Sequence, residues 1–117
     1  MTTIILKGKP KSTGTIYKMT CKGRFACLYM SEAGKTLKRD YIKQAKEQWK
    51  QKPIKGDVQL HILVYLGDKR NIDIDNIHKL TLDSLNKVVW EDDKQINKMT
   101  VEKLLDTHNP RVEITIL

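Results

Sequence analysis

Hydrophobic and polar residues alternate most regularly between Val58 and Leu66, where every second residue is aliphatic. A period of two is typical of a β-strand with one buried face, so this stretch is predicted to be a strand. Shorter apolar stretches predict further strands over residues 2–6, 24–29, 96–104 and 111–116. Residues 67–70 and 106–110 are expected to be turns because they are rich in Gly, Asp, Asn and Pro.

Two other stretches repeat their apolar residues at helical spacing. Ser31 is suited to cap a helix that reaches about Gln51. The apolar residues of this helix recur at every fourth position, at Ala33, Leu37, Tyr41, Ala45 and Trp49. A second helix is expected over residues 75–89, with a core face that contains Ile77, Leu80, Leu85 and Val88.

The resulting order, β-β-α-β-α-β-β, indicates an α/β (α+β) fold with two main helices on a single mixed β-sheet. At 117 residues the chain is expected to form one domain, residues 1–117. The stretch from Gly8 to Gly23 contains several glycines, Pro10 and four lysines, and is interpreted as a basic loop region.

Composition narrows the class of protein. The chain is 39% hydrophobic and 31% charged, and no stretch approaches the roughly 18 apolar residues of a membrane helix. Lysines interrupt the apolar N-terminus, which makes it a poor signal peptide, so we expect a cytoplasmic protein without membrane contact. Cys21 and Cys27 are expected to be reduced, and their spacing from the three histidines matches no zinc site.

Charge is distributed unevenly. Residues 1–55 carry fourteen Lys and Arg against three acidic residues, a net charge of +11, whereas residues 56–117 carry a net charge of −3. Together these give the total of +8. A basic face is often only a solvated face, but a nuclease needs a phosphate-holding surface beside a metal-holding one. The asymmetry therefore favours a protein that binds a polyanion through its N-terminal half.

Acidic residues gather in a short part of the C-terminal half. Five aspartates fall within this part of a basic chain: Asp73, Asp75, Asp83, Asp92 and Asp93. Crowded carboxylates repel one another, and ionising them all is costly unless a cation lies among them. Mg²⁺ prefers oxygen ligands and keeps several waters, so it is the ion expected here. An acidic metal site on a basic chain suggests an enzyme that acts on phosphodiesters.

Simpler roles exist for single members of this group. Asp75 or Asn76 could cap the second helix, although a cap does not explain both Asp73 and Asp75. Asp75, Lys79 and Asp83 recur every four residues, which is equally typical of an exposed ion-pair ladder. An EF-hand is excluded because, counting from Asp73, the sixth residue is His78 and the twelfth is Ser84.

The pattern D-I-D-N-x-x-K-x-x-x-D-x-L over residues 73–85, followed by W-E-D-D-x-Q over residues 90–95, resembles the RusA-type Holliday junction resolvases. These are small endodeoxyribonucleases common in phages and prophages. Pro10-Lys11-Ser12, Tyr17 and the start of the first helix at residues 31–34 fit the family more loosely. The resemblance covers most of the chain.

The resemblance implies a homodimer that cuts four-way DNA junctions with Mg²⁺, or with Mn²⁺ in its place, and without a nucleotide cofactor. The family's metal-site acids fall on Asp73, Asp75 and Asp93, and its catalytic lysine falls on Lys79. Asn76, Asp83 and Asp92 are read as supporting residues. The expected DNA contacts come from the basic stretches, at Lys7, Lys9, Lys11, Lys18, Lys22, Arg24, Lys69 and Arg70.

Two rival hypotheses remain at this point. Asp92-x-Lys94, with Asp75 upstream, mimics the acid and (D/E)-x-K layout of restriction-type nucleases, in which Lys94 would be catalytic and Lys79 incidental. The second rival is a non-catalytic DNA-binding protein that carries an acidic helix face. The two resolvase acids before the second helix and the one after it must also meet in space, which the sequence alone does not show.

Overall fold

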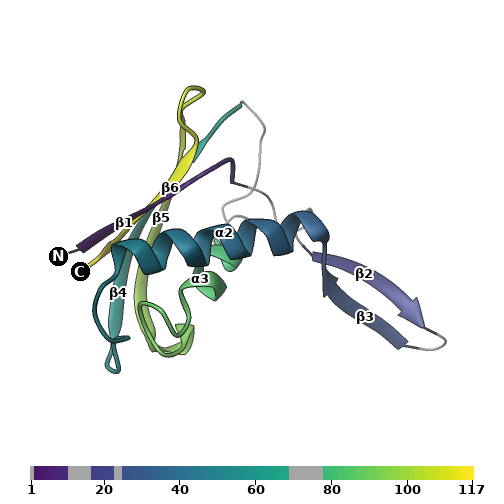
Figure 1. The fold of residues 1–117 in the computed structure, drawn as a ribbon, viewed down its shortest axis with the longest axis horizontal. Coiled ribbons are helices and arrows are strands. Elements are labelled where there is room, and N and C mark those ends of the chain that lie inside the picture. The colour runs from purple at the N-terminus through teal and green to yellow at the C-terminus, as the bar shows by residue number, and fades with distance from the viewer. Residues whose placement is uncertain (1, 11–16, 23–24, 69–77) are drawn as a thin grey trace.

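The structure is a computed structural model that describes residues 2–10, 17–22, 25–68 and 78–117 (Figure 1). Over residues 17–22 and 25–28 it describes the backbone only. The elements follow one another as β1 (Thr2–Lys7), β2 (Tyr17–Lys22), β3 (Phe25–Met30), α2 (Glu32–Gln48), β4 (Val58–Leu66), α3 (Lys79–Leu85), the short 3₁₀ helix η2 (Asp93–Gln95), β5 (Ile96–Leu105) and β6 (Arg111–Ile116). The predicted α+β class is confirmed.

Four strands form one mixed sheet in the order β1-β6-β4-β5. β4 is parallel to β5 and antiparallel to β6, and β6 is antiparallel to β1. The parallel pair requires a crossover, and α3 lies in that connection. β5 and β6 are joined by a turn, as predicted, yet they lie on opposite sides of β4. Because β5 is parallel to β4 and η2 directly precedes β5, η2 lies at the end of the sheet where β4 begins.

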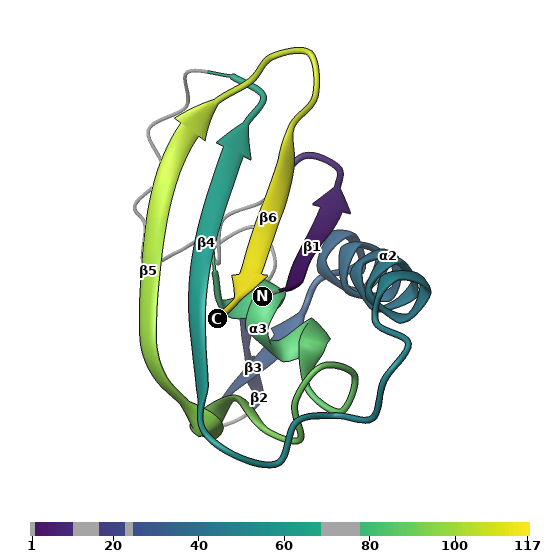
Figure 2. The same ribbon diagram turned by 90° about the vertical axis from the view of Figure 1, so that its left-hand side faces the viewer.

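The core lies between the sheet and its helices. The alternating aliphatic residues of β4 are buried, as their period of two predicts. Tyr41, Ala45 and Trp49 of the helical stripe are buried against them, and Leu80 and Leu85 come from α3. Figure 2 shows α2 beside β1 and α3 over the same face of the sheet.

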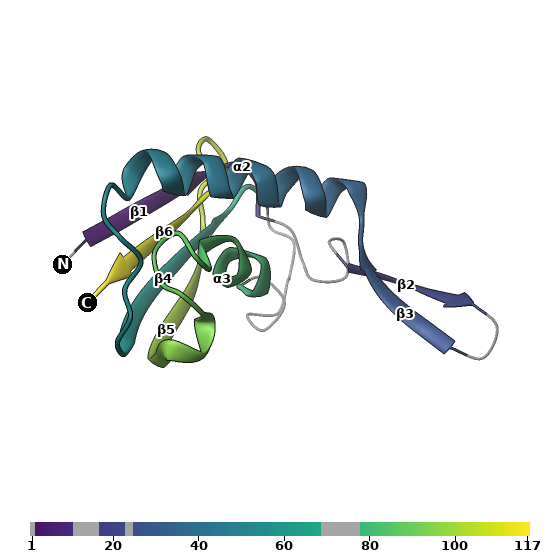
Figure 3. The same ribbon diagram turned by 60° about the horizontal axis from the view of Figure 1, so that its bottom comes forward.

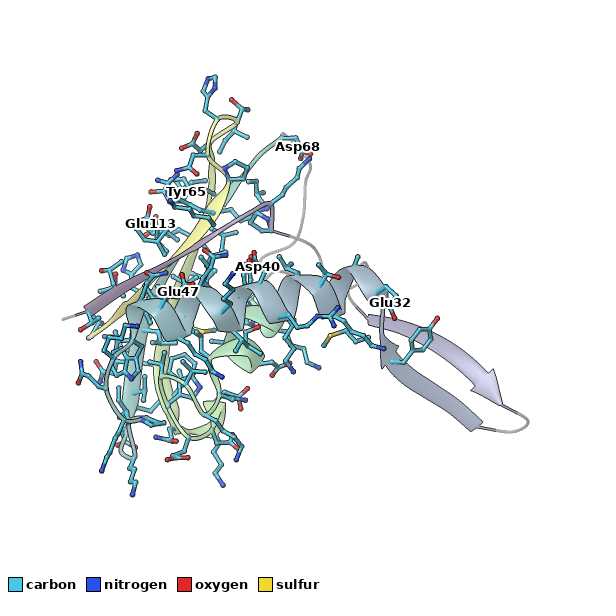
Figure 4. All side chains as sticks on the ribbon, in the orientation of Figure 1. Glu32, Asp40, Glu47, Tyr65, Asp68 and Glu113 are labelled. Carbon is cyan, nitrogen blue, oxygen red and sulfur yellow. The ribbon has the colours of Figure 1, made fainter. Side chains whose placement is uncertain are left out.

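The other face of the sheet carries polar residues. Arg111 lies over the ring of Tyr65 at 3.7 Å from its centroid. The guanidinium also pairs with Asp106 at 2.8 Å and Glu113 at 2.6 Å. Figure 4 shows Tyr65 and Glu113 on this part of the sheet, away from α2. The helices that the structure describes thus cover one face of the sheet.

α2 begins as predicted, because the Oγ of Ser31 accepts a hydrogen bond from the N–H of Gly34 at 3.1 Å. It ends at Gln48 rather than near Gln51. Only the C-terminal part of the predicted stripe is buried, while Ala33 is exposed and Leu37 partly buried. The N-terminal half of α2 extends beyond the sheet (Figure 1), so the sheet covers less of its apolar stripe.

Side chains of α2 cover the free edge of β1. The Oε1 of Gln44 accepts from the N–H of Lys7 at 2.7 Å, and its Nε2 donates to the Lys7 carbonyl at 2.9 Å. Gln48 makes the same pair of bonds with Ile5, at 2.8 and 2.7 Å. These side chains satisfy edge groups that would otherwise face water or another chain.

The interpretation of residues 8–23 as a loop is wrong for their last part, because β2 begins at Tyr17 and pairs antiparallel with β3. The two strands form a separate two-stranded sheet. Figures 1 and 3 show this hairpin extending away from the four-stranded sheet, beyond the N-terminal end of α2. The predicted strand at residues 24–29 corresponds to β3.

The second helix is shorter than predicted. α3 ends at Leu85, not at Val89, and the start expected at residues 75–77 lies outside the described residues. Lys87 has a φ of 66°, and its N–H donates to the Trp90 carbonyl at 2.6 Å. This turn buries Val89 and Trp90, whose indole N–H donates to Asn86 at 2.7 Å. The helix ends before this turn, because the turn is what brings these two side chains into the core.

No helix among the described residues is both long enough and apolar enough to cross a membrane.

Candidate active site

The described part of the predicted acidic site consists of η2 and the face of α3 that carries Lys79 and Asp83. These two residues are one helical turn apart, as the sequence indicates; Lys79 is exposed and Asp83 partly buried. Asp92 caps η2, and Asp93 is its first residue. The acids near the end of the predicted motif therefore lie on a short rigid element just before β5.

η2 is held by reciprocal capping. The side chain of Asp92 accepts from the N–H of Lys94 at 3.0 Å, and the Oε1 of Gln95 accepts from the N–H of Asp92 at 2.9 Å. The Nε2 of Gln95 donates to the carbonyls of Ile54 and Gly56, each at 2.8 Å. The site is thereby attached to the segment that precedes β4. Sequence reasoning did not assign this role to Gln95, although D-x-x-Q is a recognisable capping box.

The surroundings of Asp93 disfavour its ionised form. Partial burial raises its pKa above the ordinary value, and a hydrogen bond with Asp92 and the negative charges of Asp83 and Asp92 raise it further. The pKa of Asp92 is lowered, first by the hydrogen bond from the Lys94 N–H and then by its bond with Asp93. The negative charge of Asp83 on α3 therefore acts on Asp93 of η2, which follows it by ten residues in the sequence.

A divalent cation would suit Asp93, because a positive charge favours the ionised form that its neighbours disfavour. Within residues 2–10, 17–22, 25–68 and 78–117, no three metal-ligating side chains are grouped closely enough to hold an ion. The other two predicted metal ligands, Asp73 and Asp75, lie outside the described residues, as does Asn76. The described residues thus supply one ligand of the predicted set, together with two acids beside it.

The predicted basic surface is described at two positions. Lys7 is exposed at the end of β1. The Nζ of Lys9 pairs with Asp68 at 3.3 Å, just after the end of β4. Lys11, Arg24, Lys69 and Arg70 lie outside the described residues, and Lys18 and Lys22 belong to β2, where only the backbone is described.

Pro110, the residue before β6, contacts the chain just after β1 and just after β4 near this ion pair. The N–H of Gly8 donates to the Pro110 carbonyl at 3.2 Å. A Cβ on Gly67 would lie 3.0 Å from the Cγ of Pro110, so a side chain at this position would require the proline ring to shift. The chain therefore enters its first basic stretch next to the point where it enters the segment of Asp73 and Asp75.

Comparison with known proteins identifies the family of the chain. The model of the family described as Endodeoxyribonuclease RusA matches residues 7–117, nearly the whole chain. The chain belongs to the Endodeoxyribonuclease RusA family. The resemblance inferred from the two sequence motifs is thus confirmed at the level of the family.

Curated relatives of this RusA-family chain carry the name crossover junction endodeoxyribonuclease RusA. Those of Escherichia coli (strain K12), Enterobacteria phage 82 and Shigella sonnei (strain Ss046) are each 37% identical to it over 60 residues. Each match covers 50% of this chain and 50% of the relative. The matched segment thus spans about half the length of these proteins.

Proposed function

We propose that this RusA-family chain is an endodeoxyribonuclease that resolves four-way DNA junctions by paired symmetric nicks, with Mg²⁺ as cofactor. The observation that carries the proposal is the position of Asp93. The η2 capping box fixes Asp93 beside other acidic residues. The RusA nuclease model matches this chain over residues 7–117. The names of its curated relatives support the junction as substrate. Their phage and bacterial origin supports action in the bacterial cytoplasm.

Asp73, Asp75 and Asp93 are the proposed ligands of the metal. When bound, Mg²⁺ would act as a Lewis acid toward the scissile phosphate and lower the pKa of a coordinated water. Asp93 must lose its proton before it can bind a cation, and its raised pKa shifts that loss to higher pH. Asp92, whose pKa is lowered, stays ionised and keeps η2 capped.

Lys79 is the proposed partner of the phosphate. It is exposed on α3, one turn before the partly buried Asp83, whose negative charge acts on Asp93. A lysine there can balance the negative charge that develops on the phosphate during cleavage. Lys94 is the alternative under the restriction-type hypothesis, since it lies within η2 itself.

The proposed DNA contacts are the basic residues of the N-terminal half together with Lys69 and Arg70. Such contacts hold phosphates without reading sequence, which suits an enzyme that selects a branched shape. Two symmetric cuts need two sites, and one chain supplies one acidic site. We therefore propose a homodimer whose two-fold symmetry matches that of the junction.

The direct test is incubation with a synthetic four-way junction and with the matching linear duplex, each with Mg²⁺ and with chelator. Paired nicks confined to the junction with Mg²⁺ are expected, and Asp93→Asn should abolish them. Equal cutting of both substrates would favour a general metal nuclease. Binding without cutting, unchanged in Asp93→Asn, would favour the non-catalytic DNA-binding protein.

A further inference from the structure

Ile42 lies on a face of α2 that is rich in basic residues. Residues three, four or seven positions apart share a helix face, and four basic residues stand at these spacings from Ile42. They are Lys35, Lys38, Arg39 and Lys46. Ile42 is partly buried, yet it is not among the described hydrophobic side chains that form the core or pack against it. The role of this isoleucine is therefore not the packing of the core.

Ile42 lines a surface hollow of about 330 Å³, called here the α2 hollow. Met30, the last residue of β3, supplies its other apolar side chain and itself packs against the core. The remaining lining residues are Lys35, Lys38 and Arg39. This volume is at the lower end of the range for small-ligand sites. The α2 hollow thus combines two apolar side chains with three cations around a space for one small group.

The α2 hollow opens away from β1. The side chain of Gln44 marks the β1 side of the helix, because it bonds both backbone groups of Lys7. At about 100° per residue, Ile42 points about 200° round the helix from Gln44. An occupant of the α2 hollow would therefore leave the contacts between α2 and β1 intact.

The cations of the α2 hollow are available to a ligand. Lys35 pairs with Glu32 at 3.6 Å, but both side chains are more than half exposed, and such a surface pair contributes little. Within the described chain, neither Lys38 nor Arg39 forms an ion pair. A bound polyanion would thus gain cationic partners without breaking a buried interaction.

DNA is the polyanion expected at this surface, since the chain belongs to the Endodeoxyribonuclease RusA family. A paired duplex keeps its bases stacked inside, so its phosphates could use the cations while the apolar side chains stayed unused. An unstacked nucleotide offers both a phosphate for the cations and a base for the apolar side chains. The apolar part of the α2 hollow therefore distinguishes unpaired from paired DNA.

We propose that the α2 hollow binds one unstacked nucleotide of the DNA substrate. Lys38 and Arg39 hold its phosphate, and its base lies against Met30 and Ile42. This inference rests on the DNA binding in the proposed function and adds a substrate class, which is branched or bulged DNA that carries unpaired bases. A fully paired duplex lacks the base contact and binds through its phosphates alone.

Fluorescence anisotropy in chelator tests the α2 hollow without cleavage. Three labelled probes share one sequence: a paired duplex, the same duplex with a bulge of three unpaired thymines, and the same bulge with abasic residues in place of the thymines. Both bulges have the same phosphates, so the ratio of their affinities isolates the base contact. Wild-type protein should bind the thymine bulge about tenfold more tightly than the abasic bulge. Equal affinity for the two bulges would overturn the inference.

Two substitutions of Ile42 should move this ratio in opposite directions. Ile42→Ala removes part of the base contact and should lower the ratio about threefold or more, whereas Ile42→Tyr adds a ring for stacking and should raise it. Ile5→Ala makes the same change as Ile42→Ala at a 36% exposed position on the other face of the sheet, and should keep the wild-type ratio. A poorly folded variant would not raise the ratio, so Ile42→Tyr keeps the test decisive. Wild-type ratios in both Ile42 variants would refute the α2 hollow.

Cleavage of a fully paired four-way junction with Mg²⁺, measured on the same proteins, separates this inference from the proposed function. Junction cleavage by a wild-type protein that binds both bulges equally would refute the α2 hollow and leave the nuclease proposal standing. A base-dependent affinity that follows Ile42, without junction cleavage, would support the α2 hollow and refute the nuclease proposal.

Discussion

Asp92 and Gln95 cap each other at the two ends of η2. The Asp92 carboxylate accepts from the Lys94 N–H at 3.0 Å, and the Gln95 side chain accepts from the Asp92 N–H at 2.9 Å. Asp93 lies between them, so these bonds fix the backbone that carries the proposed catalytic carboxylate. Gln95 also joins η2 to Ile54 and Gly56. Asp93, whose pKa is raised, thus lies on a short element that is hydrogen-bonded on both sides.

Gln95→Ala should lower the free energy of unfolding by about 1–2 kcal/mol, because it removes the partner of one N–H and two carbonyl groups. Cleavage should fall as well, because Asp93 loses its fixed position. Urea denaturation and junction cleavage measure the two effects. Gln95→Glu keeps the acceptor for the Asp92 N–H but loses both donors, so an intermediate stability is expected. Wild-type stability in Gln95→Ala would contradict the role of this clamp.

Asp93 should make the metal-free protein less stable as pH rises. Its pKa is raised in the folded state, so ionisation favours the unfolded chain, and stability falls between the ordinary Asp pKa and the raised value. Asp92 acts in the opposite sense, since its lowered pKa costs stability only at lower pH. Melting in chelator from about pH 4 to 7 should show this fall in the wild type and not in Asp93→Asn. The same fall in both proteins would assign it to another group.

Mg²⁺ should stabilise the folded chain if it binds at the proposed site. At a hundredfold excess over its dissociation constant, a ligand of the folded state adds about 2.7 kcal/mol to the unfolding free energy. Differential scanning calorimetry with Mg²⁺ and with chelator should show a higher melting temperature in Mg²⁺ for the wild type only. An equal rise in Asp93→Asn would place the ion elsewhere.

Lys9 and Asp68 offer a matched pair for the DNA surface. Lys9→Ala should weaken junction binding and reduce the salt slope, log K against log [salt], by about 0.9 if this lysine meets one phosphate. Asp68→Asn should tighten binding slightly, because Lys9 loses the carboxylate that it contacts at 3.3 Å. Fluorescence anisotropy over a salt series measures both. An unchanged slope in Lys9→Ala would remove this residue from the DNA surface.

Lys79→Ala and Lys94→Ala separate the resolvase arrangement from the restriction-type arrangement. Loss of a group that stabilises transition-state charge costs about a hundredfold or more in rate. We expect that loss in Lys79→Ala and near wild-type single-turnover rates in Lys94→Ala, whose backbone N–H still caps Asp92. The reverse pattern would favour the restriction-type nuclease.

The strands β1, β4 and β6 could be predicted from sequence because buried residues recur at every second position along them, as apolar residues do in the sequence. β4 begins and ends where the alternation of aliphatic residues does. β2 was missed because its lysines were interpreted as loop residues, although they alternate with Tyr17, Met19 and Cys21. The end of α3 could not be predicted from periodicity, since the turn at Lys87 serves to bury Trp90.

Part of the candidate site was also readable from the sequence. The clustered aspartates and the two motifs predicted an acidic site that includes Asp83, Asp92 and Asp93, and in the structure the charges of Asp83 and Asp92 raise the pKa of Asp93. Their proximity depends on where the crossover between β4 and β5 places η2, which no local pattern encodes. The expected meeting of Asp73 and Asp75 with Asp93 stays a prediction, because the first two residues lie outside the described part of the chain.

Gln44 and Gln48 make the two borders of the sheet unequal. By occupying the backbone groups of Lys7 and Ile5, they close the β1 border to any additional strand. Along β5 no strand of the described chain provides a similar seal. Continuous growth of the sheet into a fibre needs two open borders, so the two glutamine side chains disfavour polymerisation through the sheet edges.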